Sequence, residues 1–314
     1  RQQLLGALAR ALAGYREQTG CAPRVLFHGR EWGESQPAGW SEALPVDLLP
    51  VAVEEVAAVG PESWLATLAL GASAVLLLDD AGLPGSVSPL LEREVAWVAR
   101  LLDGLGEQAP SVALVDQPPA QRAAAAAAPL PAARFASDQD KRTTLAMAAD
   151  HLWQALGRVE TPIELPAGTP LGTLDFNHDA CTLCMSCVSI CPLKALHDGG
   201  DTPRLAFVEQ NCVQCGLCVS ACPEKALALH PRFLPDPEPR RQQRVFKEEE
   251  PLRCTGCGKP FATPSVINLM TERLKDHPMF QGRGLERLKM CEDCRVRAIF
   301  DDDDAQPPRG MTAS

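Results

Sequence analysis

The chain has 314 residues, a formal net charge of −10 and 46% hydrophobic residues, which allows a sizeable core over roughly two domains. The acidic balance argues against a nucleic-acid partner, because phosphates need a basic surface. The longest apolar run, residues 65–78, is too short for a membrane span, and no signal-peptide pattern is visible. All cysteines except Cys21 lie in C-x2-C-type groups, so we expect a reducing, cytoplasmic environment rather than a disulfide scaffold.

Strands and helices alternate through residues 1–116, which we expect to form an α/β domain with a leading helix. Apolar patterns predict helices over 4–15, 61–70 and 88–105, and strands over 24–28, 46–53, 74–78 and 112–115. This alternation indicates a parallel sheet covered on both faces. The segment GREWGESQPAGW at 29–40 is expected to be a loop. His28 precedes it and is expected to be structural, although ligands often bind where α/β strands end.

The α/β domain is followed by a Pro/Ala-rich linker at 117–136 and by a segment at 137–160 that contains a predicted helix over 138–156. Within residues 1–160 we find no dinucleotide or phosphate-binding glycine motif and no grouping of catalytic side chains. We therefore expect no catalytic activity from this part of the chain.

Two copies of the pattern C-x2-C-x2-C-x3-C-P follow, at 181–192 and 212–223. Thiolates at this spacing fit a cubane iron–sulfur cluster, and two runs fit two [4Fe–4S] clusters. Two zinc sites are the alternative, but four cysteines so close in sequence are awkward ligands for one tetrahedral ion. The repeat predicts a pseudo-two-fold core with a hairpin turn at 196–201, a return strand at 205–208 and a short helix after each Cys-Pro.

Residues 174–230 resemble the bacterial-type two-cluster [4Fe–4S] ferredoxins, so we assign 161–236 to an α+β dicluster ferredoxin-like domain. In that family the fourth cysteine of each run ligates the other cluster. The resemblance implies that cluster I is held by Cys181, Cys184, Cys187 and Cys222. It likewise implies that cluster II is held by Cys212, Cys215, Cys218 and Cys191. Gly216 of the second run is replaced by Met185 in the first, which suggests unequal reduction potentials.

A charged segment at 237–252, which contains RRQQRVFKEEE, is expected to be a linker. Beyond it, a small domain at 253–298 with a helix at 265–275 is expected to form a four-cysteine zinc knuckle. Its ligands are the two C-x2-C pairs Cys254, Cys257, Cys291 and Cys294. Zinc is the default metal, and rubredoxin-type iron or a third iron–sulfur cluster stays open. His277 is expected to lie at the surface, and the acidic tail at 299–314 to be disordered.

The α/β stretch, 24–116, resembles the small iron–sulfur (delta) subunit of hydrogenase–heterodisulfide reductase systems. The segments RVLFH, PVDLLPVAVEEV and WLATLALGASAVLLL carry the likeness. That family places cysteines for a [2Fe–2S] cluster after its first strand and after its GA-x-x-V-L strand, where this chain has His28-Gly-Arg and Asp79-Asp80. The resemblance therefore implies a docking scaffold without that cluster, because Cys21 alone cannot hold one.

The order of α/β domain, dicluster domain and CTGCGKPF…HPMF…MCEDCR knuckle is similar to ferredoxin-like proteins of proteobacterial formate dehydrogenase clusters. The resemblance implies an electron-transfer protein that relays single electrons to or from a partner oxidoreductase, with formate dehydrogenase subunits as the partner. The alternative is an accessory or maturation factor for a molybdenum-containing formate dehydrogenase. A third hypothesis is a core subunit of a larger redox enzyme.

Overall fold

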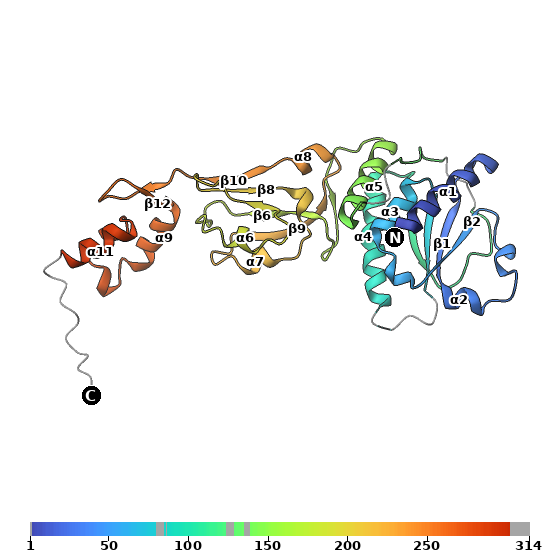
Figure 1. Ribbon diagram of the computed structural model, residues 1–314, viewed down its shortest axis with the longest axis horizontal. Helices are drawn as coiled ribbons and strands as arrows, with labels where there is room; N and C mark the ends of the chain where they lie inside the picture. The colour runs from blue at the N-terminus through green and yellow to red at the C-terminus, as the bar shows by residue number, and fades with distance from the viewer. Residues whose placement is uncertain (1, 80–84, 86, 124–128, 135–138, 302–314) are drawn as a thin grey trace, which may run out of the picture. The chain divides into compact units, whose positions relative to one another are not determined.

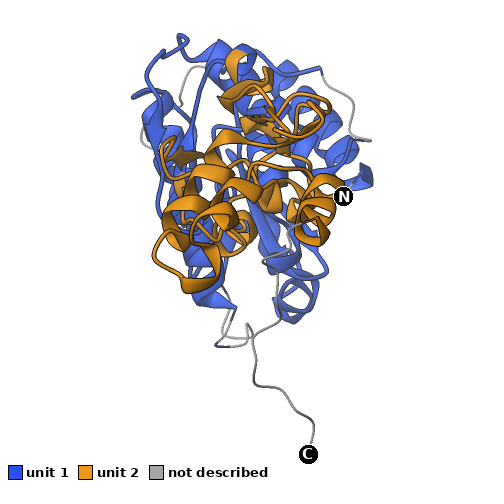
Figure 2. Cartoon of the chain, turned by 90° about the vertical axis from the view of Figure 1, so that its left-hand side faces the viewer, with its two compact units in different colours: residues 1–171, 231–238 blue, residues 172–230, 239–314 orange. Residues whose placement is uncertain are grey.

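The computed structural model describes residues 2–79, 85, 87–123, 129–134 and 139–301 (Figure 1). The chain divides into two compact units, shown in two colours in Figure 2. Unit 1 contains residues 1–171 and 231–238, and unit 2 contains residues 172–230 and 239–314. The finer domain bounds drawn from the sequence stay predictions. Within the described ranges, every helix is too short or too polar to cross a membrane.

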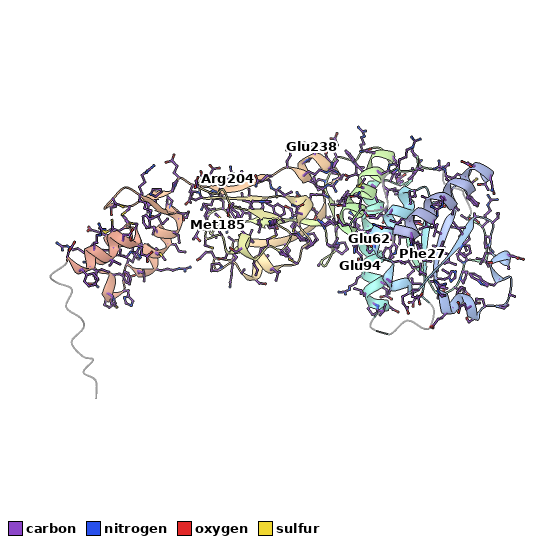
Figure 3. All side chains as sticks on the ribbon, viewed as in Figure 1. Phe27, Glu62, Glu94, Met185, Arg204 and Glu238 are labelled. Carbon is purple, nitrogen blue, oxygen red and sulfur yellow. The ribbon has the colours of Figure 1, made fainter. Side chains whose placement is uncertain are left out.

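Unit 1 is built on a four-stranded parallel sheet with the strand order β2–β1–β3–β4. Its strands are β1 (Arg24–Gly29), β2 (Leu48–Val53), β3 (Ala74–Leu78) and β4 (Ser111–Val115). Apolar side chains alternate between two cores, because successive strand residues point to opposite faces. Val25 and Phe27 join the larger core and Leu26 the smaller one. Phe27 is fully buried on β1 (Figure 3). The predicted parallel sheet is confirmed.

The larger core of unit 1 is built with four helices. They are α1 (Gln2–Thr19), α3 (Pro61–Ala69), α4 (Ser88–Leu105) and α5 (Lys141–Ala155). Helix α3 packs against the other three, and Trp64 on it is fully buried. Pro61 at its first position and Gly71, with a φ of 112° just past its end, set its bounds. These helices agree with those predicted from apolar spacing, with shifts at their ends.

The smaller core lies on the other face of the sheet, beside residues 29–40, which the sequence predicts to be a loop. That segment contains α2 (Arg30–Ser35) and the 3-10 helix η1 (Trp40–Ala43). Trp32 packs on this core, and its ring centroid lies 5.0 Å from that of Trp40. Isolated helices this short are unstable, so packing of the tryptophans overrides the glycines and proline that suggested a loop. His28 is buried against both rings, as a structural histidine would be.

Unit 2 contains a pair of short helices and a hairpin. Helix α6 (Ser186–Ile190) contacts α7 (Leu217–Ser220), and β7 (Leu196–His197) pairs antiparallel with β8 (Arg204–Phe207). The predicted hairpin is thus confirmed. Strands β6 (Gly172–Phe176) and β9 (Leu227–Phe233) belong to a further sheet. In unit 1, β5 (Ile163–Glu164) pairs with the end of β9, where Ile163 lies opposite Phe233.

The short helices of the cysteine runs lie before the fourth cysteine and not after it, so the helices predicted after Pro192 and Pro223 are wrong. Helices α6 and α7 each contain the third cysteine of a run. Each Cys-Pro is followed by a turn, in which Lys194 and Lys225 have left-handed φ values of 50° and 51°. The left-handed backbone at Lys194 and Lys225 is incompatible with a right-handed helix at these positions.

The charged segment at 237–252 is not an irregular linker. It contains α8 (Pro237–Arg241) and β10 (Arg244–Glu248), which pairs antiparallel with β8. On β10, the ring of Phe246 stacks on Phe176, with centroids 4.9 Å apart, and on Phe207 at 5.3 Å. Hydrogen bonds between the strands and this aromatic stacking stabilise β10 as a strand, although the neighbouring residues are charged.

The C-terminal part of unit 2 is mostly helical. It contains β11 (Leu252–Arg253), β12 (Pro260–Ala262), α9 (Pro264–Leu274), α10 (Arg283–Arg287) and α11 (Glu292–Phe300). Strands β11 and β12 form an antiparallel pair. The predicted helix at 265–275 is confirmed as α9, and the hydroxyl of Thr263 caps it by accepting the N–H of Val266. Three sequence features lie outside the described residues: Ala124–Ala128 of the alanine run, Asp80, and the acidic tail from residue 302 onward.

Candidate metal centres

Two cavities of unit 2 each collect cysteines from both runs. One cavity is lined by Cys181, Cys184 and Cys187 of the first run together with Cys222 of the second. The other is lined by Cys212, Cys215 and Cys218 of the second run together with Cys191 of the first. The structure therefore brings together the same two sets of four thiols that the ferredoxin resemblance implies.

The loops that carry these cysteines share an unusual backbone. Leu183 and Met185 of the first run have φ values of 55° and 61°, and their counterparts Gln214 and Gly216 have 54° and 78°; Met185 is labelled in Figure 3. Only glycine adopts this left-handed region at little cost, so the other three residues are strained. Such strain persists only where the surroundings enforce it. The repetition in both loops supports the predicted pseudo-two-fold relation.

Hydrogen-bond donors face the sulfur atoms of these loops. The N–H groups of Ala195 and Ala226 each donate at 3.2 Å to the Sγ atom of the fourth cysteine in their run. The N–H of Leu183 donates to Cys181 Sγ at 3.4 Å. In the second run, the side-chain amide of Gln214 donates to Cys212 Sγ at 3.3 Å. Donors to sulfur stabilise thiolates and tune the potentials of clusters bound to them.

Two buried thiols, Cys187 of the first cavity and Cys218 of the second, resist ionisation on their own. Burial raises the pKa of Cys187 to about 12, and the neighbouring Cys181 and Cys184 add to the rise. Burial, with the charge of Cys212 next in order, raises the pKa of Cys218 to about 11. Four thiolates in one cavity therefore need a bound cation beside them. Soft sulfur ligands and N–H donors aimed at them fit an iron–sulfur cluster.

The third set of cysteines is much tighter. The Sγ atoms of Cys254, Cys257, Cys291 and Cys294 all lie within 4.8 Å of one another. Two of them, on Cys257 and Cys291, are 3.7 Å apart, close to the spacing of about 3.8 Å for thiolates bound tetrahedrally at ~2.3 Å. Elsewhere in the described ranges, no other group of three or more Cys, His or acidic side chains is this compact. The cysteines of the two cavities are thus less closely spaced than this set.

Cys254 is the least exposed residue of this tight set. It is buried, and its Sγ accepts N–H groups from Cys291 at 3.2 Å and Gly256 at 3.3 Å. The pKa of Cys254 is lowered to about 6, and the hydrogen bond from the N–H of Cys291 makes the largest contribution. A Cβ atom at Gly256 would meet Cys294 Sγ at 3.1 Å, so the turn favours glycine. His277 is exposed and caps the 3-10 helix η4 (Pro278–Phe280), apart from the metal set.

Sequence reasoning missed one charged residue beside the first cavity. Lys247 on β10 is buried, and its ammonium group donates to the carbonyl oxygens of Cys181 at 2.6 Å and His178 at 3.1 Å. It also pairs with Glu249, at 3.1 Å between Nζ and Oε1. The run of charges around it suggested a solvated linker, and only recognition of the strand pattern RVFKE could have found it.

Residues 180–227 match a family model described as a 4Fe-4S dicluster domain, and residues 211–262 match a second model of the same description. No curated protein matches the chain. The matches support an iron–sulfur, ferredoxin-type domain with a role in electron transfer, and such a domain implies a redox partner. The second match extends past Cys254 and Cys257, so these comparisons do not separate zinc from a further cysteine-bound cluster at the tight site.

Proposed function

We propose that this chain is an electron-transfer protein that binds two [4Fe–4S] clusters and relays single electrons to or from a partner oxidoreductase. The convergence of four thiols from both runs in each cavity carries the proposal. Cluster I is assigned to Cys181, Cys184, Cys187 and Cys222. Cluster II is assigned to Cys212, Cys215, Cys218 and Cys191. Each bound cluster takes up and releases one electron, which the partner supplies or accepts, so no atom is transferred.

The side chains around the cavities suit this role. Cys184 and Cys215 are exposed, whereas Cys181, Cys187 and Cys212 are buried. Each cavity therefore has one ligand at the surface, where an electron can enter or leave over a short distance. The remaining walls are mainly apolar and limit access of water. We assign no catalytic residue to this chain.

For the tight C-terminal site we propose one structural zinc ion held by Cys254, Cys257, Cys291 and Cys294. Four thiolates that surround a single ion leave no open position for substrate, which is typical of structural sites. Their mutual distances, all below 4.8 Å, favour one ion over a cubane cluster. A single iron ion has the same donor set and is distinguished by metal analysis.

We further propose formate dehydrogenase as the partner, because the order of domains and the knuckle segments resemble ferredoxin-like proteins of formate dehydrogenase clusters. The test mixes anaerobically purified protein with the dehydrogenase and formate, and follows bleaching of the cluster absorbance. Oxidation of one formate releases two electrons, so about one formate should reduce both clusters of one chain. An unrelated dehydrogenase with its own substrate serves as the control.

Reduction that is no faster with formate dehydrogenase than with the control enzyme would contradict the proposed partner. The alternative, an accessory factor for maturation, makes a different prediction. In that case, deletion of the protein would leave the dehydrogenase without its molybdenum cofactor, and electron exchange between the purified proteins would be slow.

A further inference from the structure

We propose that Lys247 is a positioning residue that holds a fixed positive charge beside Cys181 and thereby raises the reduction potential of cluster I relative to cluster II. The inference rests on the proposed binding of two clusters and adds a determinant of the order in which they accept electrons. The charge comes from β10, a strand outside both cysteine runs.

The burial of Lys247 is built into the strand pairing. The register of β10 against β8 shifts between Val245 and Lys247, so the alternation of side chains is broken at this point. Val245 is exposed, whereas Lys247 is only 6% exposed. Lysine is almost never buried unless it is paired. Here the ammonium group donates to the carbonyl of Cys181 at 2.6 Å and to the hydroxyl of Ser265 at 2.9 Å.

The counter-ion of Lys247, Glu249, is itself restrained. Glu249 accepts from the hydroxyl of Ser265 and from the Ser265 N–H, the latter at 3.1 Å. Burial alone would raise the pKa of Glu249, but these hydrogen bonds and Lys247 hold it below its usual value, so the carboxylate is ionised. The ammonium group of Lys247 itself lies 2.6 Å from the carbonyl oxygen of Cys181. The positive end of the pair therefore acts on Cys181.

The two cavities differ in the side-chain donor that contacts the first cysteine of each run. In the second run the side chain that donates to Cys212 Sγ is the neutral amide of Gln214. A full charge acts over a longer distance than an amide dipole. A cation next to a cluster stabilises the reduced form, which carries one more negative charge, so it raises the potential of that cluster. We therefore expect the charge of Lys247 to favour reduction of cluster I over reduction of cluster II.

The test is a redox titration of the holoprotein, followed by EPR, on two variants whose effects have opposite signs. Lys247→Met removes the cation and should lower the potential of one couple only. Glu249→Gln leaves the cation uncompensated and should raise the potential of that same couple. Each should change the distribution of an electron between the clusters at least tenfold, which corresponds to about 59 mV for a one-electron couple. Lys247→Arg keeps the positive charge, so the potential of cluster I should stay close to its wild-type value.

Gln214→Leu is the matched control, because it removes a donor from Cys212 and should move only the other couple. If Lys247→Met does not retain both clusters, the double variant with Glu249→Gln leaves no unpaired charge and should still lower the cluster I potential. Shifts of the same sign in both single variants, or equal shifts of both couples, would overturn the proposal. Failure of the proposed function itself would appear separately, as wild-type protein without iron and sulfide.

Discussion

Replacing Cys191 with alanine should remove the cluster bound in the cavity of Cys212, Cys215 and Cys218, although Cys191 belongs to the other run. The reason is that Cys191 lines that cavity and alanine offers no ligand atom. The iron content should fall from about eight to about four per chain. The EPR spectrum of the remaining reduced cluster should match that of Cys215→Ala.

The reciprocal variant provides the matched control, because Cys222→Ala should give the spectrum of Cys184→Ala. Cys21 lies in unit 1, so Cys21→Ala should retain all the iron. If ligands did not cross between the runs, Cys191→Ala would instead match Cys184→Ala. That outcome would contradict the assignment of both clusters while leaving the number of clusters unchanged.

Replacing Cys254 with alanine should release the metal of the C-terminal site and unfold the segment at 253–298, while both iron–sulfur clusters remain. The buried apolar side chains of this segment are Cys254, Ile267, Leu288 and Cys291, and two of these four are proposed ligands. So small a core cannot offset the entropy of ordering the chain. Metal binding, on the order of 10 kcal/mol or more for structural zinc, must therefore stabilise the segment.

The measurement combines zinc and iron analysis with hydrogen exchange resolved by segment. Exchange within 253–298 should become fast in the variant, whereas β7 and β8 should keep their protection. Removal of zinc from the wild-type protein with a chelator should give the same pattern and should be reversed by added zinc. Retained protection at 253–298 after complete loss of the metal would show that the segment folds without it.

The parts of the fold that were predictable are those with a strong local pattern. The strand AVLLL and the helix that begins at Pro61 have apolar residues throughout or at regular spacing, and both occur where predicted. The cysteine spacing predicted which thiols would share a cavity, because the ferredoxin resemblance supplied the crossing of the fourth ligand. Local sequence and known chemistry were sufficient in these cases.

The errors arose where tertiary contacts override local pattern. The segment around Trp32 contains glycines and a proline that suggested a loop, but packing of the ring on the sheet stabilises a short helix. The segment RVFKE reads as charged, yet Phe246 stacks between two other rings and Lys247 is buried against backbone carbonyls. The stacked rings and the carbonyl groups belong to segments distant in sequence, so the run of charges alone did not show these contacts.

The most direct test of the central claim is analysis of iron, acid-labile sulfide and zinc in anaerobically purified protein, with EPR of the reduced form. If the chain binds two [4Fe–4S] clusters and one structural zinc ion, the protein should contain about eight iron, about eight sulfide and about one zinc per chain. The reduced protein should show the signals of two paramagnetic clusters. Protein that contains about three zinc ions, no sulfide and no EPR signal on reduction would contradict an electron-transfer role.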